Sequence, residues 1–189
     1  TIENKAIKHI NYQLIDLNTI TQEDAEIKNL IATYNNAPSF KEVIGFSELD
    51  HQRNQVGNFT ADALRLQMGV DIAFQNKEIF QILPFNNDAI TYNMTVAEIK
   101  NFLKGSGDGF YYAGVIFQKS NNEVVVKYLN GTVIPDSTVL TVGVNDYIPA
   151  VHDTYFTSGK IVSSQTDAET VISYLKQVKK ITRRSNRIY

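Results

Sequence analysis

Hydrophobic residues recur with the spacing of one helix face in four stretches of the chain. Two of these stretches open with a capping box, a threonine followed three positions later by a glutamate: Thr95 with Glu98, and Thr166 with Glu169. Gly69 stands where another stretch stops, and glycine commonly follows a helix end. The pattern predicts helices over residues 21–34, 58–68, 95–103 and 166–178, with a fifth, shorter helix over residues 77–83.

The same pattern predicts which helix residues form apolar sides. They are Ile27, Leu30, Ile31 and Tyr34, then Phe59, Ala63 and Leu66, then Val96, Ile99 and Leu103, and finally Val171, Ile172, Leu175 and Val178. Alternating or continuous apolar runs predict strands over residues 42–49, 70–74, 89–94, 110–118, 124–129 and 139–144. Because helices and strands are mixed without a regular βαβ order, we expect an α+β fold. No repeat or long linker divides the chain, so we expect a single domain over residues 1–189.

The composition is that of a globular protein and excludes several classes of function. Of 189 residues, 43% are hydrophobic and 20% are charged, which is close to the average for folded domains. A net charge of −2 lacks the basic excess of a general nucleic-acid binder. Without cysteine there are no disulfides, catalytic thiolates or zinc–thiolate sites. We expect no transmembrane segment, and the start at Thr1 rather than Met suggests a processed protein.

The histidines and glycines do not form a recognisable catalytic motif. His9, His51 and His152 are the only histidines, and none has a partner at metal-ligand spacing. The glycines at residues 105–109 lack the Lys-Ser/Thr ending of a phosphate loop, so they predict a turn. An acid–base pair of His152 and Asp153 is an alternative, but neighbouring side chains usually point apart. We therefore expect no catalytic and no metal-binding residue in this chain.

Aromatic and amide side chains gather at two places where predicted elements end. Phe85, Asn86 and Asn87 follow the short helix, and Asn145, Asp146 and Tyr147 follow a buried strand. Residues at such ends are well placed to line a pocket. Loop residues packed on the core are the alternative interpretation.

Four segments in register resemble the C-terminal, substrate-specificity domain of the 5′-nucleotidase family. Residues 56–65 resemble its opening Gly-Asn-x-x-Ala-Asp-Ala-x-Arg helix, and residues 70–76 resemble the next strand, which ends at an asparagine. Residues 77–87 resemble a helix that leads into Leu-Pro-Phe-x-Asn, and residues 142–155 resemble its Asn-Asp-Tyr segment. The resemblance covers residues 45 to 180 and implies a four-layer α/β/β/α fold with mixed sheets, preceded by an extension (residues 1–44) whose helix packs on it.

The resemblance implies roles for five residues. Phe85 and Tyr147 would clamp a base between two rings, and aromatic stacking tolerates different bases. Asn87 would bond the base, Asp153 would bond the ribose hydroxyls, and Asn76 would end the strand beside them. The ligand is then a nucleotide or nucleoside.

Two departures from the family pattern bear on this site. Where the family has Gly-Gly-Asp-Gly, this chain has residues 151–154, Val-His-Asp-Thr, which must reshape the rim. The family's Gly-Gly-x-Arg loop has no counterpart, because Asn76 is followed directly by Lys77. A strand and the following helix are rarely connected without any residue between them. Either a loop is absent from the printed sequence between Asn76 and Lys77, or the protein lacks this loop.

The metallophosphatase domain of the family has no counterpart in this chain. The resemblance implies that the chain is inactive alone and works outside the cytoplasm, in the periplasm or at the cell surface, with a separate metallophosphatase domain or chain. Any divalent metals would belong to that partner, and we expect no cofactor in this chain. The alternative is a non-catalytic surface or binding protein that kept the fold and lost the nucleotide site.

Overall fold

The computed structural model describes residues 2–3, 5–7, 10, 12–76, 86–107, 109–120 and 123–181. The chain divides into two compact units, Thr1–Val43 and Ile44–Tyr189. The boundary lies beside residue 45, where the predicted core begins. Each unit is described by itself.

The first unit contains short elements and one longer helix. Strands β1 (Ile2–Glu3) and β2 (Ala6–Ile7) pair antiparallel, and they are followed by the 3-10 helix η1 (Leu17–Thr19), α1 (Ala25–Asn35) and α2 (Pro38–Lys41). Helix α1 begins four residues later than predicted, because Asp24 is its cap: the carboxylate accepts from the backbone N–H of Glu26 and of Ile27. The helix itself is confirmed, and its packing on the second unit stays a prediction.

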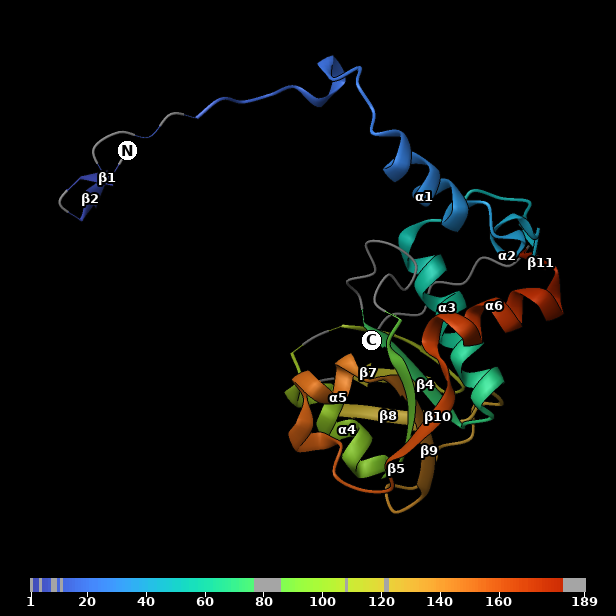
Figure 1. Ribbon diagram of the computed structural model, residues 1–189. Coiled ribbons are helices and arrows are strands. Elements are labelled where there is room, and N and C mark those ends of the chain that lie inside the picture. Colours follow the sequence, from blue (N-terminus) through green and yellow to red (C-terminus); the bar gives the residue numbers. More distant parts are fainter. Residues whose placement is uncertain are drawn as a thin grey trace. The chain divides into compact units, whose positions relative to one another are not determined.

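The centre of the second unit is a five-stranded mixed sheet (Figure 1). Its strands are β4 (Ile72–Asn76), β5 (Asp88–Thr95), β6 (Phe110–Ala113), β9 (Val139–Asn145) and β10 (Ile161–Thr166), in the spatial order β10-β5-β9-β4-β6. Strands β4 and β9 are parallel, and the other neighbouring pairs are antiparallel. The predicted α+β class with mixed sheets is confirmed.

The described residues of this unit also form two small sheets. Strands β7 (Ile116–Ser120) and β8 (Glu123–Lys127) form an antiparallel pair, and β3 (Phe46–Ser47) runs parallel to β11 (Lys180–Ile181). The single strand predicted over residues 110–118 is wrong, because Gly114 adopts φ 101° and divides it into β6 and β7. The strand predicted over residues 42–49 is reduced to β3.

In the described part of the second unit, four α-helices and one 3-10 helix lie around these sheets. They are α3 (Arg53–Met68), α4 (Val96–Gly105), α5 (Tyr147–Val151), η2 (Asp153–Tyr155) and α6 (Asp167–Val178). Helix α3 begins five residues earlier than predicted, with the side-chain oxygen of Gln55 accepting from the backbone N–H of Gln52. Helices α3 and α6 pack side by side (Figure 1).

The sheet separates two apolar cores. The larger core lies on the side of α4 and the β7–β8 pair, where Phe74 of β4 packs against Phe102, Phe110 and Phe117. The smaller core lies on the other side, where Leu64 of α3 meets Ala73 and Ala89. Alternate residues of each strand therefore point to opposite cores, as the period of a strand requires.

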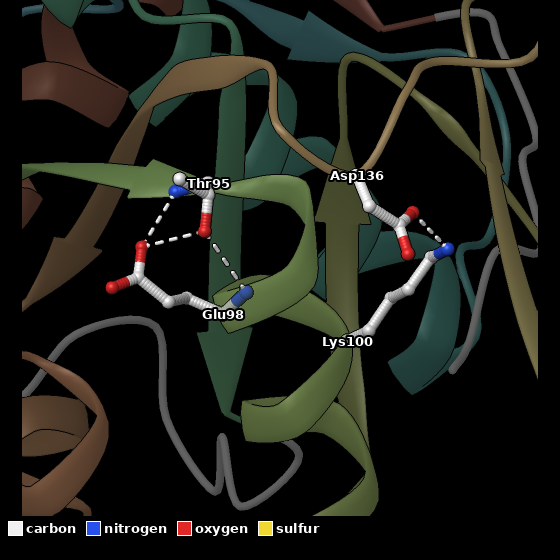
Figure 2. Close-up of polar contacts among 4 residues, drawn as sticks. All are labelled: Thr95, Glu98, Lys100 and Asp136. Atoms are coloured by element: carbon white, nitrogen blue, oxygen red, sulfur yellow. Dashed lines mark hydrogen bonds and ion pairs between the residues drawn. The ribbon is translucent and has the colours of Figure 1, made fainter.

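The N-terminus of α4 shows how directly the sequence specifies this part of the fold. Glu98 accepts from the backbone N–H and the hydroxyl of Thr95 at 2.7 and 2.8 Å, while the hydroxyl oxygen of Thr95 accepts from the backbone N–H of Glu98 at 3.2 Å (Figure 2). Lys100 pairs with Asp136 beside this box (Figure 2). Val96, Ile99 and Leu103 are buried, as the apolar pattern predicts.

The predicted apolar side of α1 (Ile27, Leu30, Ile31 and Tyr34) is exposed, and so are two predicted core residues of the second unit. Leu66 is on the outside of α3, because the buried side of that helix follows Gly57, Ala61 and Leu64. Ile172 is exposed on α6, while its neighbour Val171 is buried. In both helices the side formed by apolar residues is broader than the side that packs against the rest of the unit.

Candidate functional site

The strand order brings four chain segments to one edge of the sheet. Because β4 and β9 are parallel, Asn76 and Asn145 at their ends lie at the same edge. Strand β5 runs opposite to β9, with Ala89 opposite Asn145, so the start of β5 lies there too. Strand β10 runs opposite to β5 and places Thr166 beside Asp88. The ends of β4, β9 and β10, the start of β5 and the N-terminus of α6 therefore meet.

Backbone hydrogen bonds connect these segments. The N–H of Asp146 donates to the carbonyl oxygen of Asp88 at 2.9 Å, and the N–H of Asp167 donates to the carbonyl oxygen of Asn87 at 2.9 Å. Asn87 is partly buried. The segment around Asn87 is thus tied to the end of β9 on one side and to the start of α6 on the other.

Side-chain amides connect the two parallel strand ends. The side-chain oxygen of Asn76 accepts from the amide nitrogen of Gln75 at 2.8 Å and from the amide nitrogen of Asn145 at 3.3 Å. The side-chain oxygen of Asn145 accepts from the backbone N–H of Ile148 at 3.3 Å. Asn145 therefore joins the end of β4 to the first turn of α5, which begins with Tyr147.

Tyr147 presents an accessible ring at this edge. Its side chain is 51% exposed, while Ile148 next to it is buried and fixes the helix on the core. An exposed ring on a backbone held at both ends can stack on a flat ligand with little loss of conformational entropy. Of the residues predicted for the site, Asn76, Asn87 and Tyr147 lie on the segments that meet here.

Asp153 lies farther along the chain, in η2, and is exposed. Its neighbour His152 turns toward the core, where the imidazole lies edge-on to the rings of Phe102 and Phe110 at centroid distances of 5.7 and 5.9 Å. The two side chains therefore have different surroundings. This geometry does not favour the alternative in which His152 and Asp153 act as an acid–base pair.

The predicted second ring, Phe85, lies outside the described residues. The same is true of Lys77, of the helix predicted over residues 77–83, and of His9. Their roles stay predictions from the sequence. The described part of the edge consists of Asn76 and of residues 86–88, 145–148 and 166–168.

Buried polar residues beneath this edge were not predicted from the sequence. Gln75, Asn145 and Asp167 are almost fully buried, with Asp167 only 1% exposed. One signal was available for Gln75: it follows Ala73 by two positions, so it points to the same covered side of the sheet. Nothing in the local pattern distinguishes Asp167 from an exposed acid in a helix first turn.

Burial raises the pKa of the Asp167 carboxyl to about 6. The N–H of Ala168, the side chain of Asn145 and the backbone of Asn87 oppose this pKa shift, and the charge of Asp146 adds to it. Neither carboxylate oxygen makes a hydrogen bond of good geometry, so these neighbours compensate only part of the cost of burial. The carboxyl therefore changes charge near neutral pH.

Among the described residues, no group of three or more histidine, cysteine, aspartate or glutamate side chains could bind a metal ion. Within the same ranges, no helix combines the length and apolar character required to cross a membrane.

Known proteins resemble this chain in structure. No protein-family model and no curated protein sequence matches it. The fold matches a 5′-nucleotidase precursor from Thermus thermophilus (TM-score 0.65, 19% identity, 87% of this chain and 42% of that chain) and the NAD nucleotidase of Haemophilus influenzae (TM-score 0.60, 24% identity, 86% and 35%). It also matches a sulfate thiohydrolase from Thermus thermophilus (TM-score 0.61, 12% identity, 85% and 37%).

This chain spans less than half the length of each of those proteins. A match of 35 to 42% is the share that one domain of a longer chain would take. At these identities the likeness concerns the fold. The resemblance to the C-terminal domain of 5′-nucleotidases is thus confirmed at the level of the fold.

Proposed function

We propose that this chain recognises the nucleoside part of a nucleotide at the sheet edge formed by Asn76, Asn87 and Tyr147. The observation that supports this most is the convergence itself: three residues separated by up to 71 positions lie on segments joined by the Asp146–Asp88 and Asn145–Asn76 hydrogen bonds. The fold shared with two nucleotidases adds to it.

Each side chain has a chemical role in this proposal. The ring of Tyr147 stacks on the base, and each such stack contributes about 1–3 kcal/mol while tolerating different bases. The amide of Asn87 has both donors and an acceptor for the edge of the base, and the carboxylate of Asp153 accepts from ribose hydroxyls. Phe85 is the proposed second ring.

The chemical step belongs to a partner in this proposal. A separate metallophosphatase domain or chain supplies the divalent metals and cleaves the phosphate ester, and this chain supplies recognition. The two meet outside the cytoplasm. The resemblance to 5′-nucleotidases is the support for both statements.

Calorimetric titration of AMP into the full chain tests the proposal. We expect saturable binding that weakens by about tenfold or more in Y147A, because a lost stack removes about 1–3 kcal/mol. The matched control is Y128A, since Tyr128 is also an exposed tyrosine, 42% accessible, but lies in the turn after β8. Equal affinities in the wild type, Y147A and Y128A, or no binding at all, would refute the clamp.

A non-catalytic binding protein that lost the nucleotide site is the second candidate. The rim favours it, because exposed Val151 and core-facing His152 stand where the family has two glycines. The match to a sulfate thiohydrolase also shows that the fold occurs in proteins with other substrates. This candidate predicts that AMP does not bind to the wild type at millimolar concentration.

A further inference from the structure

Asp167 contacts two of the segments that meet at the sheet edge. Its backbone N–H is bonded to the carbonyl oxygen of Asn87, and its buried carboxylate lies beside the side chain of Asn145. It is the first residue of α6, after the cap Thr166, whose hydroxyl oxygen accepts from the backbone N–H of Glu169. The helix therefore fixes the position of the carboxylate.

The side-chain amide of Asn145 is used on both of its ends. An asparagine amide nitrogen has two N–H groups, and one of them is used by Asn76. The second is available to the carboxylate of Asp167, whereas the amide oxygen accepts from the N–H of Ile148. If the amide turned over, both the bond to Asn76 and the bond to Ile148 would be lost. A negative charge at Asp167 favours the orientation that keeps both.

Among the residues that the structure describes, one charge acts directly on Asp167. Asp146, at the end of β9, raises the cost of ionising Asp167. Strand β10, which packs on α6, has no ionisable residue. The remaining ionisable groups on α6 and on the described elements next to it are Glu169, Tyr174, Lys176, Arg53, Asp62, Arg65, Lys180, Asp88 and Tyr92.

We propose that Asp167 is a positioning residue, whose ionised carboxylate orients Asn145 and thereby sets the arrangement of Asn76 and of the α5 turn that presents Tyr147. The consequence for ligand affinity rests on the proposed function, whereas the effect on Asn145 belongs to the free protein. Protonation of the buried carboxyl removes the preference for one amide orientation. The Asn145 side chain and the segments bonded to it are then more ordered above neutral pH than in mild acid.

Nuclear magnetic resonance of the ligand-free, isotope-labelled full chain tests the positioning role. From pH 4.5 to 7.5 we expect the Asn145 side-chain amide and the Ile148 backbone amide to titrate together with a midpoint near 6, and this titration to vanish in D167N. The control D146N keeps the titration but moves its midpoint to lower pH, because one repelling charge is removed. Resonances that do not titrate in the wild type, or that titrate alike in D167N, would overturn the proposal.

A second arm separates this inference from the proposed function. The probe is adenosine, because a nucleotide phosphate itself titrates near pH 6. We expect adenosine to bind severalfold more tightly at pH 7.5 than at pH 5 in the wild type, with no such change in D167N. An amide titration without adenosine binding contradicts the nucleotide function alone. Adenosine binding without the amide titration contradicts the role of Asp167 alone. If D167N does not fold, the amide titrations of the wild type and D146N still test the role of Asp167.

Discussion

The backbone N–H of Asp146 donates to the carbonyl oxygen of Asp88 at 2.9 Å, although 58 positions separate them in the sequence. Each of these residues is next to one predicted for ligand recognition: Asn87 precedes Asp88, and Tyr147 follows Asp146. A hydrogen bond this close to both residues limits how far their backbones can separate. The site is therefore built on sheet pairing rather than on independent loops.

Gly57 is predicted to be one of the least replaceable residues of α3. A Cβ built on it lies 2.1 Å from a ring carbon of buried Tyr111, so alanine at this position forces the ring or the helix to move. We expect G57A to lower the free energy of unfolding by about 3 kcal/mol, measured by urea denaturation.

The control for Gly57 is G69A, at a position with φ 66° and no heavy atom near the added carbon. Only backbone strain applies there, so we expect a loss of about 1–2 kcal/mol. The clash would be disproved if G57A were no more destabilising than G69A. In a Y111A background, the cost of G57A should largely disappear.

Removal of the capping box at α4 should destabilise the second unit. T95A removes the hydroxyl that accepts from the Glu98 backbone N–H, and caps of this kind contribute about 1 kcal/mol. Urea denaturation of T95A beside T132A, at an exposed turn threonine, measures this loss. Equal stability of the two variants would show that the box is not needed.

Asp167 makes stability depend on pH with a sign opposite to that of most acidic residues. Its pKa is about 6 in the folded chain, against about 3.9 for an aspartate in an unfolded chain, so between these values the folded state binds more protons. The contribution of Asp167 to the free energy of unfolding is therefore fully present below pH 3.9, and it is lost as the pH rises through 6.

D167N isolates this contribution. From pH 4.5 to pH 7, the stability of D167N relative to the wild type should rise by about 2 kcal/mol, as judged by urea denaturation at the two pH values. If the free energy of unfolding changed with pH in the same way in both proteins, the pKa of the Asp167 carboxyl would not be raised in the folded chain.

The sequence predicts those parts of the fold that local signals specify. Helix α4 begins where its capping box stands, and β5 and β9 lie within one residue of the predicted ends. Errors occur where the signal is unusual or absent. The start of α3 is capped by Gln52 and Gln55 rather than by a serine or threonine, and the short helix α5 contains Pro149, which is tolerated only because it lies in the first turn.

The candidate site was predictable in part for the same reason. Asn87 and Tyr147 follow predicted elements, so their placement at element ends is a local property, whereas Asn76 was expected from the resemblance to 5′-nucleotidases. The burial of Asp167 is not, because it depends on β9 and on the Asn87 segment, which are distant in the sequence. Long-range contacts of this kind give no periodic signal.

The most direct test of the central claim is a map of the amide resonances that AMP shifts in the full chain. We expect the largest changes at Asn76, Asn87, Asp146 and Tyr147. These changes should saturate together and be reduced in Y147A but not in Y128A. A titration that shifts only resonances of the β7–β8 pair, or shifts none, would contradict this claim.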